Sequence, residues 1–128
     1  MSKRVLAVDD EPDVILLVRA TLEPEGYKVQ GASSGEECLR IVESDPPDVI
    51  LLDVMMPGMN GAQVTTRLKS KPETSVLPII MITALGDKKY IQAALFKYGV
   101  DYYIVKPFDP DDLIEKVRDA IKYRRFLD

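Results

Sequence analysis

Histidine is absent from this sequence, and Cys38 is its only cysteine. A single cysteine excludes an internal disulfide and favours a reducing compartment. The sequence contains neither a stretch of about 20 apolar residues nor the apolar segment of a signal peptide. From these absences we expect a cytoplasmic protein that does not act at a membrane.

Positive charge is also in deficit, because 17 basic residues stand against 21 acidic ones and leave a net charge of -4 and a pI near 4.9. A domain that binds nucleic acid usually carries a basic surface, so direct binding to DNA is disfavoured. The sequence also lacks the Gly-rich loop that cradles ATP phosphates. Any phosphoryl group handled by this chain would therefore be delivered by another molecule.

The length of 128 residues fits a single domain, which we place over residues 1–128. Strand-like apolar runs alternate with helical patterns, as in α/β folds with a parallel sheet. Two central runs are apolar on both faces, as strands covered by helices on both sides are. The predicted strands are 5–8, 27–31, 49–52, 79–82 and 102–105. The pattern predicts a doubly wound sandwich in which five strands alternate with five helices.

Capping residues mark the ends of several predicted helices. Ser33 or Ser34 can cap the second helix, and Gly99 is a natural end for the fourth helix, predicted at about 87–98. Asp109 can cap the last helix, which carries an apolar stripe. These signals support the helix assignments between the strands.

Polar or charged residues follow four of the predicted strands at the point where each strand ends. They are Asp9, Asp10, Asp53, Thr83 and Lys106. In an open parallel sheet the carboxyl ends of the strands lie along one edge, and ligands bind outside that edge. We therefore expect three carboxylates, a hydroxyl and an ammonium group to converge there.

The three carboxylates would repel one another in a partly dehydrated cleft unless a cation lay between them. All-oxygen ligands suit Mg²⁺, and Mn²⁺ can replace it. A carboxylate can also attack phosphorus and form an aspartyl phosphate, with the metal screening it from the incoming anion. Thr83 and Lys106 would then offer a hydroxyl and a fixed charge to the phosphoryl oxygens.

Five motifs, read together, carry a resemblance to a known family. They are Val8-Asp9-Asp10-Glu11, the segment from Leu52 to Gly61, Thr83-Ala84, Gly99-Val100-Asp101-Tyr102-Tyr103 and Lys106-Pro107-Phe108. On these motifs the chain resembles a two-component response-regulator receiver domain, similar to the single-domain chemotaxis regulators, over residues 3–125. The resemblance implies a flavodoxin-like (βα)5 three-layer sandwich with a parallel sheet in the order 2-1-3-4-5.

The same resemblance implies a role for each residue of the metal site. Asp53 would be the phosphoacceptor and the modified residue. Asp10 would bind Mg²⁺ directly and Asp9 through water, and the backbone carbonyl of Met55 would complete the protein ligands.

Three further positions are implied to act on the phosphoryl group. Lys106 would pair with Asp53 in the empty site and with the phosphoryl group in the loaded one, and Thr83 would bond a phosphoryl oxygen. Ala84 matches the small residue that leaves room for the phosphate, and the Lys106-Pro107 bond is expected to be cis.

A switch is also implied, in which Thr83 couples to the ring of Tyr103. The predicted fourth helix, the strand 102–105 and the last helix would then present an altered face to a partner. Lys88 and Lys89 begin the fourth helix; we interpret them as solvated, and the alternative is that they belong to that partner face.

Two apolar side chains, Met55 and Leu85, occupy the positions that in the family modulate access of hydrolytic water. Neither side chain can orient a water molecule. We therefore expect slow autodephosphorylation, over minutes or longer.

The function implied by the resemblance is phosphorelay signalling rather than turnover catalysis. The donor would be a sensor histidine kinase or a phosphotransfer protein, the output protein is unknown, and the chain would be a monomer or a weak phosphorylation-dependent dimer. One alternative is the receiver half of a larger transcriptional regulator. A second is an aspartyl-phosphate phosphatase, which would need an acid where Met55 stands. A third is a flavin or nucleotide carrier, for which Asp9 and Asp10 have the wrong charge.

Overall fold

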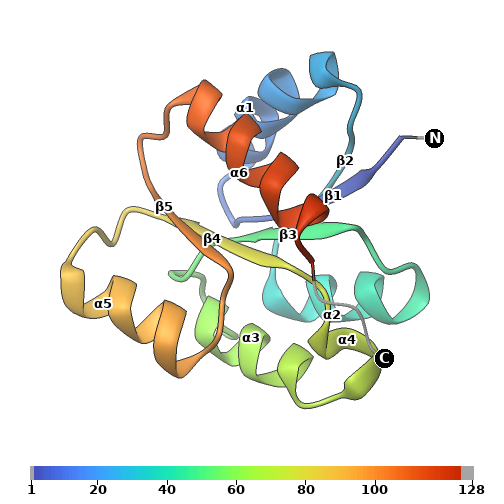
Figure 1. The fold of residues 1–128 in the computed structure, drawn as a ribbon. Coiled ribbons are helices and arrows are strands. Elements are labelled where there is room, and N and C mark those ends of the chain that lie inside the picture. Colours follow the sequence, from blue (N-terminus) through green and yellow to red (C-terminus); the bar gives the residue numbers. More distant parts are fainter. Residues whose placement is uncertain (1, 125–128) are drawn as a thin grey trace.

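The computed structural model describes residues 2–124, which form a five-stranded parallel sheet between two layers of helices (Figure 1). The strand order is β2-β1-β3-β4-β5, with parallel pairing throughout. The strands are β1 (Arg4–Val8), β2 (Lys28–Ala32), β3 (Val49–Leu52), β4 (Ile79–Thr83) and β5 (Tyr102–Val105). The predicted fold class and strand order are confirmed.

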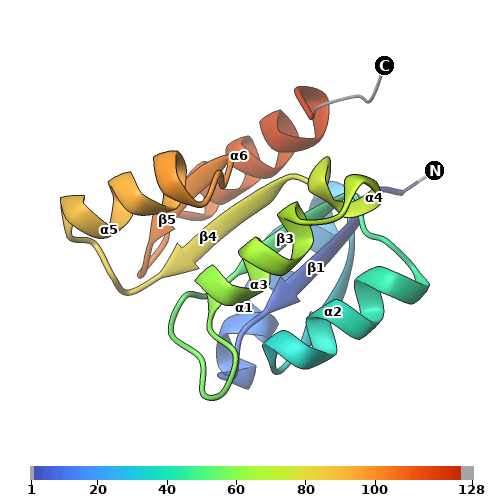
Figure 2. The same cartoon turned by 90° about the horizontal axis from the view of Figure 1, so that it is seen from below.

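Helices cover both faces of the sheet, and their apolar sides form two separate cores. The helices are α1 (Pro12–Leu22), α2 (Gly35–Ser44), α3 (Gly61–Lys69), α4 (Pro72–Ser75), α5 (Lys88–Gln92) and α6 (Pro110–Lys122). Figures 1 and 2 show α1 and α6 on one face, with α2, α3, α4 and α5 on the other. The β3 side chains alternate between the cores: Ile50 joins the α2 and α3 side, and Leu51 joins the α1 and α6 side.

Side-chain caps start the helices beside the site. The Ser34 hydroxyl accepts the backbone N–H of Glu37 at 3.1 Å at the start of α2. Asn60 and Gln63 form a reciprocal capping box at the start of α3. Asp109 caps α6, as predicted. These local bonds fix where each helix begins relative to the end of the preceding strand.

Three helical features go beyond the predicted alternation. The extra one-turn helix α4 follows α3, and Pro72 at its first position favours the helical turn. The predicted fourth helix is α-helical only over α5 and continues as the π-helix η2 (Ala93–Lys97) before Gly99 at φ 77. A short 3-10 turn, η1 (Glu23–Glu25), also follows α1. Apolar periodicity alone does not distinguish such short, 3-10 or π-helical turns from loops.

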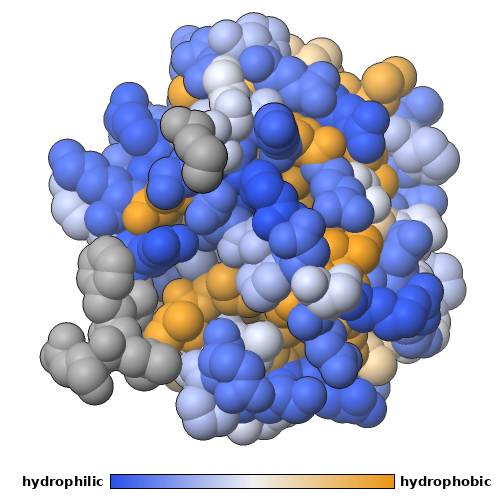
Figure 3. Space-filling view, turned by 90° about the vertical axis from the view of Figure 1, so that its right-hand side faces the viewer, coloured by the Kyte–Doolittle hydropathy of each residue, from blue (hydrophilic) through white to orange (hydrophobic). Residues whose placement is uncertain are grey.

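The side of the molecule that lies on the right in Figure 1 is mainly hydrophilic, with apolar areas between the polar side chains (Figure 3). Within residues 2–124, no helix has the length and apolar character needed to cross a membrane.

Candidate functional site

The carboxyl ends of β1, β3, β4 and β5 place the predicted polar residues together at one edge of the sheet. Sheet hydrogen bonds extend just past these strand ends: the Asp9 N–H donates to Ala32 O, the Asp53 N–H to Val8 O, both at 3.0 Å, and the Lys106 N–H to Thr83 O at 2.8 Å. The sheet therefore still holds the backbone at Asp9, Asp53, Thr83 and Lys106, from which these side chains extend.

Three carboxylates meet at this edge, each offering one oxygen within 4.8 Å of the others. Asp9 and Asp53 are buried, with 2% and 4% of their surface exposed, whereas Asp10 is exposed. Hard carboxylate oxygens with an open side toward solvent suit Mg²⁺, which binds few carboxylates and keeps several waters. The donor set therefore fits the predicted ion.

The Lys106 ammonium lies among these acids, but its shortest contact is not with the expected partner. Its Nζ donates to Asp9 Oδ2 at 2.7 Å, and it is 3.5 Å from Asp53 Oδ2 and 3.9 Å from Glu11 Oε1. The resemblance implied a Lys106–Asp53 pair. In this structure one ammonium group serves two buried carboxylates, and Asp9 holds it more closely.

Burial raises the pKa of the Asp53 carboxyl, with the Lys106 charge lowering it and the Asp9 charge raising it again. Burial also acts against the charged form of Lys106. The hydrogen bond to Asp9 and the charges of Asp53 and Asp9 outweigh it, so the pKa of Lys106 lies above its usual value. The site therefore favours the charged form of Lys106 and disfavours the charged form of Asp53.

Thr83 and Tyr103 are linked through the loop that follows β4. Thr83 is fully buried at the end of the strand, and its hydroxyl lies 3.5 Å from the Leu85 N–H. The Tyr103 hydroxyl donates to the Leu85 carbonyl at 2.6 Å. Burial and the charge of Asp53 raise the pKa of Tyr103. Ala84 is exposed between these residues. The structure thus connects the Tyr103 ring to the Thr83 loop by a short hydrogen bond.

Gly61 positions α3 against the loop that follows Asp53, and the sequence reasoning missed this role. A Cβ at Gly61 would lie 2.5 Å from the Asp53 carbonyl oxygen, so only glycine allows the observed approach. The Gly61 N–H also donates to the Val54 carbonyl at 3.0 Å. The Asn60-Gly61 pair was the available sequence signal, although it was read only as part of a turn.

The Lys106-Pro107 peptide bond is cis, as the resemblance implied. It lies beside a hollow of about 350 Å³ that the side chains of Val14, Leu17 and Phe108 line together with Glu11, Lys106 and Pro107. An apolar surface thus borders the charged site directly. Met55, on the other loop of the site, is 60% exposed.

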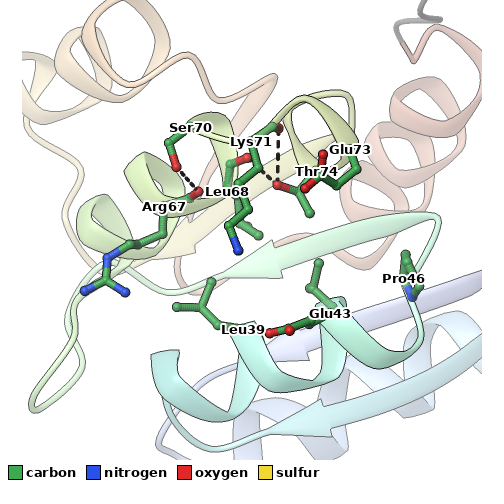
Figure 4. A pocket seen from close by; sticks show the side chains of 10 residues that line it. Leu39, Glu43, Pro46, Arg67, Leu68, Ser70, Lys71, Glu73 and Thr74 are labelled. Atoms are coloured by element: carbon green, nitrogen blue, oxygen red, sulfur yellow. Dashed lines mark hydrogen bonds between the residues drawn. The ribbon is translucent and has the colours of Figure 1, made fainter.

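A larger cavity, of about 470 Å³, lies between α2, α3 and α4 and contains none of the strand-end residues (Figure 4). Its lining includes Leu39 and Glu43 from α2, and Arg67, Leu68 and Lys71 from the opposite side. Cavity volume alone therefore does not locate the chemistry of this molecule.

Comparison with protein families and curated proteins gives a consistent result. The family model described as the response regulator receiver domain matches residues 5–118. The Bacillus subtilis alkaline phosphatase synthesis transcriptional regulatory protein PhoP is 37% identical over 122 residues, which cover 95% of this chain and 50% of that protein. The Caulobacter vibrioides response regulator PleD is 40% identical over 131 residues, covering all of this chain and 28% of that protein. The chain thus spans half or less of these relatives.

Solved structures match the fold over nearly the whole chain. A Chloroflexus aurantiacus chain described as a response regulator has a TM-score of 0.91 at 35% identity, covering 95% of this chain and 99% of that one. The Vibrio cholerae chemotaxis protein CheY4 has a TM-score of 0.86 at 30% identity, covering 94% of this chain and 99% of that one.

Proposed function

The chain belongs to the response regulator receiver domain family of two-component signalling, and on that premise we propose that Asp53 accepts a phosphoryl group from a phosphohistidine of a partner protein. Receiver domains are signalling domains rather than conventional enzymes. The observation that supports Asp53 most directly is its burial at the end of β3, beside a second carboxylate and the Lys106 ammonium. The described residues act as one receiver domain, which we place in the cytoplasm.

In the proposed transfer, an Asp53 carboxylate oxygen attacks phosphorus while the phosphorus–nitrogen bond to the donor imidazole breaks. The imidazole leaves with the electron pair of that bond and takes up a proton. The phosphoryl group passes intact from the donor to Asp53. Receiver domains bind Mg²⁺ at an acidic pocket, and here Asp9, Asp10, Asp53 and the Met55 carbonyl would hold it. When bound, the ion neutralises charge on the phosphoryl oxygens.

The remaining residues would act on the transferred group directly. The Lys106 ammonium is 3.5 Å from Asp53, so it can pair with the negatively charged phosphoryl oxygens once the group is bound there. Thr83 would offer its hydroxyl to another phosphoryl oxygen, and exposed Ala84 leaves space beside it. Movement of Thr83 would also move the Leu85 carbonyl, and the Tyr103 ring, which is hydrogen-bonded to that carbonyl, would then be freed or would turn.

The donor would dock on the apolar surface beside the site. Val14, Leu17 and Phe108 line a hollow that also contains Lys106, so a protein seated there brings its phosphohistidine to Asp53. The output face would comprise α5 with its π-helical continuation η2, β5 and α6; Tyr90 on α5 is 47% exposed and Phe96 on η2 is 84% exposed. We propose a monomer, or a weak dimer that forms on phosphorylation.

A second candidate is the receiver part of a longer regulator. The chain covers 50% of PhoP, a transcriptional regulatory protein, and 28% of PleD, a response regulator. The phosphatase alternative is disfavoured, because exposed Met55 stands where such an enzyme needs an acid.

The test is intact-mass measurement after incubation with a small acyl phosphate, with and without Mg²⁺. We expect a Mg²⁺-dependent gain of one phosphoryl group in the wild type and none in Asp53→Asn. Asp111→Asn removes an exposed carboxylate from the first turn of α6 and is the matched control, which should load like the wild type. Loading of Asp53→Asn at the wild-type rate would overturn the assignment.

A further inference from the structure

A third hollow, of about 280 Å³, lies between the start of α3 and α5 with its π-helical continuation η2. It shares no lining residue with the cavity of Figure 4 or with the hollow beside Lys106. Figures 1 and 2 place α3 and α5 on the same face of the sheet. Its size is near the lower end of the range for small-molecule sites, about 300 to 1,000 Å³.

Short side chains create this space, and one long apolar side chain forms its floor. Ala62 reaches it from α3, and Ala93 and Ala94 reach it from the helix opposite. Met81, 1% exposed on β4, lies beneath them. Alanines on both helices leave a gap that bulkier residues would close. The floor therefore suits an apolar, compact group.

Three tyrosines line the same hollow: Tyr90, Tyr98 and Tyr103. The hydrogen bond from Tyr103 to Leu85 O holds one ring in place. Lys97 Nζ lies 5.4 Å from the centre of the Tyr98 ring. Aromatic side chains pack favourably against a planar ring, in offset or edge-to-face arrangements. The walls therefore favour an aromatic ligand over an aliphatic one.

Among the described residues, Lys89 is the only charged one that lines the hollow, and Asn60 adds a side-chain amide. The Asn60 carboxamide oxygen already accepts the Gln63 N–H at 2.9 Å, which leaves its NH₂ group to donate. The neighbouring acid, Asp87, does not line the hollow and accepts the Lys89 backbone N–H at 3.1 Å. An ammonium and an amide donor beside an aromatic pocket match a carboxylate group.

We propose that this hollow binds a small aromatic carboxylate, with its ring among the three tyrosines and its carboxylate on the Lys89 ammonium and the Asn60 amide. The proposal gives Lys89 a role distinct from that of its neighbour Lys88, which does not line the hollow. Binding needs no chemistry at Asp53, so it stands or fails independently of phosphoryl transfer. Contact with Tyr103 would also restrain the loop at Leu85.

The test is titration of the ¹⁵N-labelled chain with 4-hydroxybenzoate, followed by amide chemical shifts. We expect saturable shifts confined to residues 54, 60–62, 81, 85–98 and 103, with a dissociation constant of about 1 mM or tighter. Two ligand controls separate the contributions: 4-hydroxybenzamide lacks the charge and acetate lacks the ring. Both should bind at least about fivefold more weakly.

Matched variants locate the ligand. Lys89→Ala should weaken binding by about threefold to fivefold, as expected for an exposed ion pair, and Lys88→Ala should leave it unchanged. Ala93→Leu fills the hollow and should abolish binding, with the unperturbed shifts of α1 and α6 showing that the variant is folded. The proposal is overturned if the shifts lie around Leu39 and Lys71 or if the benzamide binds as well as the benzoate. It is also overturned if both lysine variants have the same effect or if binding does not saturate by about 10 mM.

Discussion

The two edges of the same sheet differ in how their charged groups are paired and in how far these groups are exposed to solvent. At the carboxyl-terminal edge, buried Asp9 and Asp53 share the single Lys106 ammonium. At the amino-terminal edge, Arg4 Nη1 pairs with Asp45 at 2.9 Å, and its backbone N–H donates to Asp48 at 2.7 Å. The site edge thus holds unbalanced charge in low dielectric, whereas the opposite edge neutralises its charges in partial contact with water.

This difference indicates that stability and function depend on different edges of the sheet. Arg124 Nη1 lies 3.4 Å from Asp48, so a second cation joins the amino-terminal edge. In the described part of that edge, Arg4 and Arg124 thus pair with Asp45 and Asp48, and solvent can compensate for a local change there. At the site edge two acids, Asp9 and Asp53, are buried and share one cation, so solvent cannot compensate for a change there in the same way.

The largest expected effect comes from removing one cation from each edge. Lys106→Met leaves two buried carboxylates without their ammonium and should lower the free energy of unfolding by about 2 to 4 kcal/mol at neutral pH. Arg4→Met removes a partly exposed pair and should cost less than about 1 kcal/mol. Urea denaturation of both variants measures the difference. Equal losses would show that the two edges are not electrostatically distinct.

The lifetime of the phosphoryl group tests the apolar rim of the site edge. Met55→Asn with Leu85→Glu introduces groups that can orient a water molecule, and we expect phosphate loss about tenfold faster or more. The wild type should retain its phosphate for minutes or longer. Decay is followed by intact mass after removal of the donor. An unchanged decay rate in the double variant would contradict the proposed control by these two side chains.

Added Mg²⁺ should stabilise the site edge alone. At ten times its dissociation constant, the ion should raise the free energy of unfolding by about 1.4 kcal/mol through preferential binding to the folded chain. Asp10→Asn should lose most of this gain, whereas Asp45→Asn at the opposite edge should keep it. Thermal unfolding with and without Mg²⁺ gives the comparison. The same gain in Asp10→Asn would remove this residue from the predicted ligand set.

Replacing an aspartate by asparagine should change the free energy of unfolding in opposite directions at the two edges. The pKa of Asp53 is raised, so its folded form binds a proton more tightly than its unfolded form and its charge opposes folding above about pH 4. Asp53→Asn should therefore stabilise the metal-free chain by about 1 kcal/mol at pH 7, and this gain should vanish toward pH 4.

Asp48→Asn is the matched change at the amino-terminal edge. It weakens the contacts with Arg4 and Arg124 and should destabilise by up to about 1 kcal/mol. Chemical denaturation at pH 4 and pH 7 distinguishes the two variants. Stabilisation by both, or by neither, would contradict the contrast between the edges.

Much of the fold could be predicted from the sequence, because its signals are local. Apolar runs that end in Asp9, Asp53, Thr83 and Lys106 predicted the strands, and the motif resemblance implied their order. The helix α4 and the π-helical end of the fourth helix could not be predicted. Both depend on how the chain packs rather than on apolar periodicity.

The candidate site was predictable as a set of residues but not as a geometry. Gly61 read as a turn residue until the structure placed its α-carbon against the Asp53 carbonyl. Tyr103 was identified only through resemblance, whereas its bond to the Leu85 carbonyl is visible only in three dimensions. Lys89 gave no signal that distinguished it from Lys88, because adjacent helix residues have the same local pattern but face different surroundings.

The sequence by itself determined that acids, a hydroxyl and an ammonium group would meet at one edge, because parallel strands end on the same side of a sheet. Only the tertiary structure decided which acid holds the ammonium. Lys106 is 97 residues from Asp9 along the chain, and a difference of less than 1 Å separates its contacts with Asp9 and Asp53. Such distances are set by packing between elements remote in sequence, and the interaction between charges in a buried site depends steeply on them.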